Sequence, residues 1–170
     1  MAKRISLREF QQHVTARLQD LATTQAAATR LGLRVGTENW LVMLTDISEV
    51  MPVPMLAQTP MTHNWFRGVA NVRGTLVAVS DLSGFAGGEL APVNMDTRIV
   101  LAHPKYGVNA GLMVSRMLGL RNPENFTRLP DSECRHAWES AVYEDEQGNR
   151  WRELNIPVLV AQEEFLNIGR

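Results

Sequence analysis

The sequence is poor in the features that mark secreted and membrane proteins. It contains a single cysteine, Cys134, so no disulfide can form within the chain, which fits a reducing compartment. No apolar run is long enough to span a membrane, and residues 1–14 lack the apolar segment and the small-residue cleavage site of a secretory signal. We therefore expect a soluble, cytoplasmic protein without direct membrane insertion.

An excess of positive charge and a phosphate-binding motif are absent as well. Lysine and arginine total 17 against 18 acidic residues, and the formal net charge of −1 gives no general electrostatic reason to bind nucleic acid. The glycine-rich segment 83–92 is not followed by Gly-Lys-Ser/Thr, so it is not a phosphate-binding loop. We predict no cofactor and no nucleic-acid partner.

Catalytic and metal-ligating groups do not gather into a recognisable motif. No two histidines have the spacing of a zinc-protease helix; they are His13, His63, His103 and His136. The densest set of ligand types offers only one cysteine and one histidine, in Asp131, Glu133, Cys134 and His136. Structural zinc usually takes four ligands of the cysteine or histidine type. We predict no metal site and no enzymatic activity.

What is present is a chain of 170 residues with 45% hydrophobic content, enough for one ordinary domain or two small packed subdomains. Segments rich in β-branched and apolar residues predict short strands at 31–35, 40–44, 47–53, 66–72, 75–82, 98–102, 108–114, 117–120, 141–144 and 150–154. Many short strands with few long helices favour a barrel or a sandwich. Residues 121–137 are predicted to be irregular with a helical turn near Ser132, and a short helix is predicted from Pro157 through Leu166.

The N-terminal region has a different pattern. Ser6 and Glu9 have the spacing of a helix capping box. Apolar residues then recur at steps of three and four, which predicts an amphipathic helix; this N-terminal stripe consists of Leu7, Phe10, Val14, Leu18 and Leu21. We interpret residues 1–30 as a helical extension whose stripe packs on the chain's own β-domain, residues 31–170. Docking to another protein is the alternative.

Residues 51–61 form a proline-rich stretch that predicts an extended connection. Its three methionines are Met51, Met55 and Met61. We interpret them as core-filling side chains. An adaptable partner surface is the alternative.

The most informative stretch is residues 65–82, WFRGVANVRGTLVAVSDL. Two apolar segments flank Arg73-Gly74, which predicts two strands joined by a tight turn in which Gly74 supplies a positive φ. The nearly uninterrupted apolar run in the second strand predicts burial on both faces. Polar residues border these strands. One interpretation pairs Glu49 with Arg73 across adjacent strands, because one buried unpaired charge is costly. The alternative places Arg73 at a rim where the acidic or carbonyl groups of a partner dock.

This stretch resembles the signature of the CheW family of chemotaxis coupling proteins, in which Gly-Val-x-Asn-hydrophobic-Arg-Gly leads into a hydrophobic strand ending in Asp-Leu. The Ala-Asn-Val-Arg-Gly form preceded by Trp65 is more similar to the branch that serves twitching motility through type IV pili. The resemblance implies a mainly β fold of two small five-stranded SH3-like β-barrels that share a core.

The same resemblance implies a function without catalysis. Proteins of this kind couple the cytoplasmic tip of a methyl-accepting chemoreceptor to the regulatory domain of a CheA-type histidine kinase, here at receptor arrays that control pilus motility. In that family the matching glutamate and arginine are linked near the receptor-binding groove, so the resemblance implies a salt bridge between Glu49 and Arg73, which we predict. The resemblance thus implies a partner-binding set consisting of Glu49, Asn71, Val72, Arg73, Gly74 and Asp81.

Two alternatives belong to other functional classes. One is a small β-barrel that binds a small molecule inside, although small barrels are normally filled by side chains. The other is an enzyme that uses Cys134, for which no evident base is placed to lower the thiol pKa.

Overall fold

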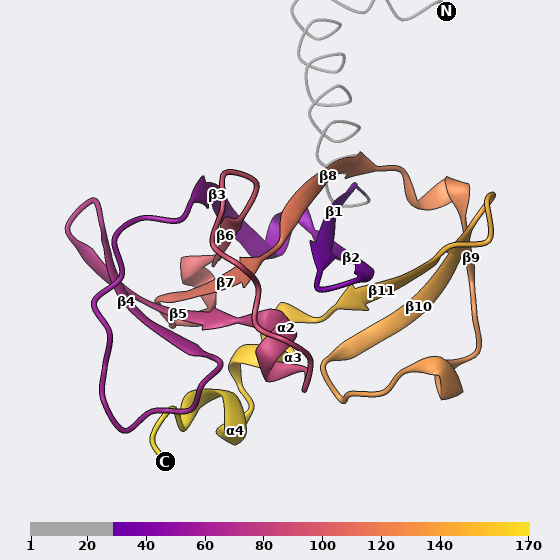
Figure 1. The fold of residues 1–170 in the computed structure, drawn as a ribbon. Coiled ribbons are helices and arrows are strands. Elements are labelled where there is room, and N and C mark those ends of the chain that lie inside the picture. Colours follow the sequence, from indigo (N-terminus) through magenta and orange to yellow (C-terminus); the bar gives the residue numbers. More distant parts are fainter. Residues whose placement is uncertain (1–28) are drawn as a thin grey trace, which may run out of the picture.

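The computed structural model describes residues 29–170 (Figure 1). Eleven strands in this part of the chain form two sheets, joined by short helices and loops. The mainly β fold predicted from the sequence is confirmed, but the sheets have six and five strands rather than five each. The predicted N-terminal helix and His13 lie outside the described residues.

The first sheet has six strands in the order β8-β1-β2-β11-β10-β9. Neighbours are antiparallel except β2 and β11, which run parallel. In β1 the alternate residues Leu31, Leu33 and Val35 lie on one face and are buried, as the two-residue period of a strand requires. The strands are β1 (Arg30–Val35), β2 (Glu38–Met43), β8 (Arg116–Arg121), β9 (Phe126–Arg128), β10 (Glu139–Asp145) and β11 (Arg150–Leu154).

The second sheet has five strands in the order β3-β6-β7-β5-β4, with β5 and β7 parallel. Its strands are β3 (Ile47–Pro52), β4 (Phe66–Val72), β5 (Thr75–Asp81), β6 (Arg98–Ala102) and β7 (Ala110–Val114). Figure 1 shows the β4–β5 hairpin at one end of the molecule and β9 with the β10–β11 connection at the other. The two hairpin ends therefore point away from each other.

The helices in the described part are short. They are α2 (Leu82–Phe85), α3 (Ile156–Val160) and α4 (Glu163–Leu166), with 3₁₀ turns at Leu44–Asp46, Pro104–Tyr106, Pro123–Asn125 and Asp131–Glu133. Pro157 opens α3, as expected, but the predicted C-terminal helix is divided in two around Gln162. Among these described helices, none has the length and apolar character needed to cross a membrane.

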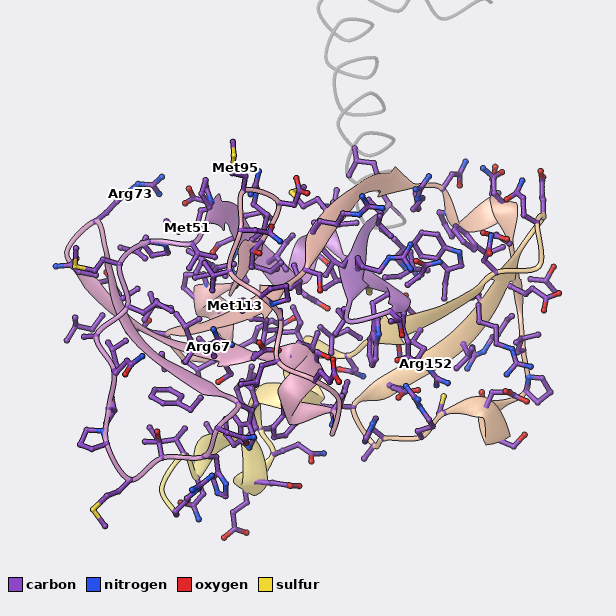
Figure 2. All side chains as sticks on the ribbon, viewed as in Figure 1. Met51, Arg67, Arg73, Met95, Met113 and Arg152 are labelled. Atoms are coloured by element: carbon purple, nitrogen blue, oxygen red, sulfur yellow. The ribbon has the colours of Figure 1, made fainter. Side chains whose placement is uncertain are left out.

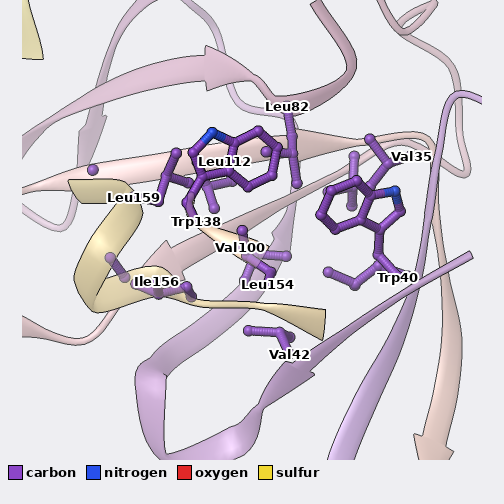
Figure 3. Close-up of a cluster of buried hydrophobic side chains, with 14 of the residues drawn as sticks. Val35, Trp40, Val42, Leu82, Val100, Leu112, Trp138, Leu154, Ile156 and Leu159 are labelled. Carbon is purple, nitrogen blue, oxygen red and sulfur yellow. The ribbon is translucent and has the colours of Figure 1, made fainter. Parts of the chain in front are cut away.

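The main core lies between the two sheets (Figure 3). It combines side chains of both sheets with α2, α3 and α4, including Val42, Val100, Leu112, Leu154 and Ile156. Burial of each such apolar side chain stabilises the folded protein by about 1.5–3 kcal/mol relative to leaving that side chain exposed. Both the six-stranded and the five-stranded sheet contribute side chains to this core. Each sheet therefore shields the apolar face of the other from water.

The opposite face of the five-stranded sheet has its own core. Ala70, Val77, Val79, Ile99, Leu101 and Met113 form this second cluster. All five residues of β7 are buried because Leu112 and Val114 face the main core while Met113 faces the second one. The middle of the sheet is thus covered on both faces.

Aromatic rings continue the main core toward the C-terminus. Trp40 stacks on Trp138 with ring centroids 5.3 Å apart, and Phe85 lies 5.9 Å from Trp138. Trp65 meets the edge of Phe85 at 5.0 Å and stacks on Phe165 of α4 at 6.2 Å. These contacts bury Trp65, as expected of a core anchor, and attach α4 to the β-domain.

Several predictions at the residue level need correction. Burial of the 75–82 strand on both faces is wrong at its start, because Thr75 and Leu76 are exposed at the hairpin end, before β5 begins to pair with β7. The short strand β9 was not predicted, since three residues between polar turns carry almost no periodicity. The helical turn near Ser132 is confirmed.

The prediction that the three methionines of residues 51–61 fill a core is correct for one of them. Met51 packs on the second core, but Met55 and Met61 are almost fully exposed and do not fill a core.

The main core predicts a clear contrast between two leucines. We expect Leu112→Ala to lower the free energy of unfolding by about 2–5 kcal/mol, because it removes buried methyl groups and leaves a cavity. Leu76→Ala, at an exposed position, is expected to change it by less than about 0.5 kcal/mol. Urea unfolding followed by tryptophan fluorescence measures both. Equal losses for the two variants would contradict the assigned core.

Candidate partner-binding site

The β4–β5 hairpin ends in a two-residue turn. Val72 pairs with Thr75, and the two residues between them, Arg73 and Gly74, have φ values of 50° and 85°. Positive φ at both central positions is the mark of the type I′ turn that matches the twist of a hairpin. The Asn71 side-chain oxygen accepts a hydrogen bond from the Gly74 N–H at 2.8 Å. Asn71 therefore fixes the turn, and the turn projects Arg73 outward (Figure 2).

Arg73 forms the predicted salt bridge with Glu49. Arg73 Nη1 lies 2.5 Å from Glu49 Oε2 and Nη2 lies 2.7 Å from Oε1, a two-pronged arrangement that matches guanidinium to carboxylate. The predicted adjacency of the two strands is wrong, because β3 and β4 are the opposite edges of the five-stranded sheet. The twisted sheet brings its edges close enough for one ion pair to join them.

This ion pair is partly open to solvent. The exposed fractions are 77% for the Arg73 side chain and 31% for that of Glu49. The hydrogen bond from Arg73 holds the pKa of Glu49 below its usual value, and the bond to Glu49 raises the pKa of Arg73. Both groups are therefore charged at neutral pH. Because exposed pairs are screened by water and salt, this one contributes more to side-chain orientation than to stability.

A groove of about 400 Å³ opens beside the ion pair. Glu49 and Arg73 stand at its edge, while the buried side chains of Val77 and Leu101 lie at its base. Val108, from the loop before β7, adds a further apolar wall. The arrangement offers an apolar surface next to a pair of oriented charges, which is the chemistry of a protein-binding surface.

Leu76 adds an apolar side chain on the same hairpin that the sequence did not single out. It pairs across the hairpin with Asn71 and is 66% exposed. The exposure of Leu76 could not be predicted, because it belongs to the apolar run of residues 76–79. Such a run does not indicate which of its side chains are exposed to solvent. The hairpin thus carries Leu76 and Arg73 within four residues of each other.

Asp81 occupies a different environment from the rest of the predicted set. Its side chain is fully buried and accepts hydrogen bonds from the N–H groups of Gly84 at 3.1 Å and Ala91 at 2.8 Å. Arg67 Nη1 lies 3.2 Å from the same carboxylate. Burial raises the pKa of Asp81, while these donors and Arg67 act in the opposite direction. Asp81 joins the end of β5 to α2 and to the loop before β6, so its influence on the surface is indirect.

The other chemical candidates are not brought together. His63 stacks on Trp65 and His136 on Trp138, while His103 accepts a hydrogen bond from the Lys105 N–H. Within residues 29–170, no three histidine, cysteine, aspartate or glutamate side chains are grouped closely enough to hold a metal ion.

Cys134 lies in a half-buried position. Burial, with Glu139 and Asp131 nearby, raises the pKa of its thiol. A raised pKa disfavours the thiolate that a nucleophilic cysteine requires.

Comparison with known proteins agrees with this geometry. Residues 30–164 match the CheW-like domain family. The chain belongs to the CheW-like family. The resemblance found in residues 65–82 is therefore confirmed, and the described hairpin, groove and ion pair lie within the matched residues.

Two known proteins are similar to this chain, one in sequence and one in structure. It is 35% identical to the protein PilI of Pseudomonas aeruginosa over 92 residues, which make up 54% of this chain and 51% of PilI. The match thus spans about half the length of that relative. The crystal structure of the scaffolding protein TtCheW from Thermoanaerobacter tengcongensis aligns with a TM-score of 0.64 over 75% of this chain and 88% of TtCheW, at 18% identity. This likeness shows the shared fold.

The Asp81 network predicts a large effect from a buried carboxylate. We expect Asp81→Ala to lower the free energy of unfolding by about 2–4 kcal/mol, because two amides lose their acceptor and Arg67 loses its counter-charge. Asp96→Ala, at an exposed position in the loop before β6, is the matched control. Urea unfolding measures stability, and hydrogen exchange reports whether the Gly84 and Ala91 amides lose protection. Unchanged protection in Asp81→Ala would contradict the proposed linkage.

Proposed function

We propose that the chain is a signalling adaptor without enzymatic activity, which couples a methyl-accepting chemoreceptor to a CheA-type histidine kinase. The observation that carries the proposal is the exposed, oriented Glu49–Arg73 pair beside an apolar groove in a CheW-like domain. An adaptor needs well-packed anchors and oriented polar groups rather than reactive ones. TtCheW, which shares the fold, is described as a scaffolding protein.

The groove and the hairpin tip form the first proposed contact surface. Its members are Glu49, Asn71, Val72, Arg73 and Gly74. Asp81, at the opposite end of β5, belongs to the proposed set only indirectly, by fixing the end of that strand. The exposed Leu76 does not line the groove, because it lies on the opposite face of β5 from the groove residues Thr75 and Val77. In this arrangement the ion pair gives the partner a fixed pattern of donors and acceptors, and the apolar groove gives it area to bury.

A second contact surface is proposed at the far end of the molecule. A hollow of about 380 Å³ lies there between the end of β8 and the β10–β11 connection, lined in part by Arg121, Phe126, Asp145 and Trp151. Trp151 is held by a hydrogen bond from its Nε1 to Asp145 at 2.9 Å. Because the two ends face away from each other (Figure 1), one partner at each end would be held in a fixed geometry.

The resemblance of residues 65–82 and the similarity to PilI support a proposal for the cellular role. We propose that the adaptor controls type IV pilus twitching motility and acts in the cytoplasm, recruited to receptor arrays at the inner membrane. The partners are the cytoplasmic tip of the receptor and the regulatory domain of the kinase.

The small-molecule alternative has less support. The face of the five-stranded sheet opposite the main core, where a ligand would have to bind, is filled by the second core cluster, including Val79, Ile99 and Met113. A ligand inside this sheet would have to displace packed side chains. The open groove at its end suits a protein surface better than an enclosed ligand.

Charge reversal at the hairpin tip tests the adaptor function. Calorimetry measures binding of the purified chain to the regulatory domain of a CheA-type kinase and, separately, to a receptor signalling hairpin. We expect binding to both, and we expect Arg73→Glu to weaken at least one by about tenfold or more, because it removes an anchor and repels Glu49. Arg170→Glu, the same charge change at the exposed C-terminus, is the control and should bind normally.

A double variant separates two roles of the pair. Glu49→Arg combined with Arg73→Glu restores an ion pair with exchanged partners. Recovered binding means that the pair orients the hairpin, whereas continued loss means that Arg73 contacts the partner. Binding of the unmodified, folded chain to neither partner would overturn the adaptor proposal.

A further inference from the structure

An apolar strip on the edge strand β8 lacks a cover from the described part of the chain. Leu120 is 63% exposed and Met117 is 40% exposed. β8 is the terminal strand of the six-stranded sheet, so it has a neighbouring strand on one side only. Exposed apolar side chains that are grouped together mark a surface that another element covers.

The strip is continuous with the main core. Leu120 lies opposite Leu31 of β1, and Met117 lies opposite Leu33, with one extra β8 residue between them at a bulge. Opposed residues on neighbouring strands project from the same face of a sheet. Leu31 and Leu33 belong to the main core, so Leu120 and Met117 extend that apolar face beyond the point where the second sheet covers it.

The N-terminal stripe of the same chain is attached to the β-domain next to the exposed strip and can cover it. Arg30, the first residue of β1, pairs with Arg121, next to Leu120, so residues 1–28 join the β-domain beside the exposed strip. The N-terminal stripe ends at Leu21, nine residues before Arg30. Nine extended residues span up to about 30 Å, several times the spacing of neighbouring strands, so the stripe can reach the strip.

We propose that the N-terminal stripe docks on the Leu120–Met117 strip of its own chain. An amphipathic helix gains stability mainly by burying its apolar face, and the strip is an exposed apolar surface that lies, through the β1–β8 pairing, beside its attachment point. A short tether gives the stripe an effective concentration in the millimolar range, which favours docking within one molecule. The docking does not depend on the adaptor function.

Limited proteolysis of the full-length chain tests the proposal. Trypsin cleavage after Arg17, within the stripe, is followed by mass spectrometry. We expect slow cleavage in the unmodified chain and a rate about tenfold higher in Leu120→Asp, because a charge replaces the buried leucine contact. Leu21→Asp, which changes the stripe away from the cleaved bond and leaves the β-domain untouched, should give the same acceleration, and Leu76→Asp, at an exposed leucine of the other sheet, should not.

Three outcomes would overturn the proposal. The first is cleavage of the unmodified chain as fast as that of Leu120→Asp. The second is equal acceleration by Leu76→Asp, which would mean a general effect of the charge. The third is protection that disappears on dilution, because the stripe would then cover a second copy of the chain rather than its own strip.

Discussion

The whole architecture depends on an apolar layer that two sheets share. Val42 and Leu154 from one sheet and Val100 and Leu112 from the other meet in a single cluster, which α3 closes with Ile156. A layer of this kind holds the sheets in one relative orientation, since sliding either of them would expose apolar surface. Both hairpin ends, and the surfaces they carry, are positioned through this contact.

Buried polar groups outside this layer are tolerated because each has partners on several elements. Glu153 of β11 faces Arg30 of β1 and accepts hydrogen bonds from Ser140 and Tyr143 of β10. Asp81 serves the other sheet in the same way, through donors on α2, on the following loop and on β4. A buried carboxylate with several donors restricts its neighbours more strongly than apolar contacts do, because no other arrangement satisfies it. These two residues therefore make the connections between strands specific.

Local patterns allowed most of the strands to be predicted, and the β4–β5 hairpin best of all. Two β-branched segments around Arg73-Gly74 carry enough information to locate both strands and the turn. The Glu49–Arg73 pair was predicted, but the pair joins opposite edges of the sheet. That placement depends on the order of the strands, which the hydrophobic periodicity of the sequence does not indicate. The same limit explains Leu76 and Asp81, whose exposure and burial are decided by which elements cover the strand ends. Sequence reasoning identified the chemistry of the site, and the fold determined which residues reach its surface.

The conformation of Arg73 bears on why an arginine occupies the hairpin tip. A residue with a side chain is disfavoured at φ 50°, where glycine or asparagine is the usual choice. The exposed ion pair with Glu49 offers little compensation, since solvent screens it. Stability alone would therefore favour a different residue at this position. This imbalance, together with the oriented, permanently charged guanidinium beside an apolar groove, supports the proposal that the hairpin tip is a contact surface.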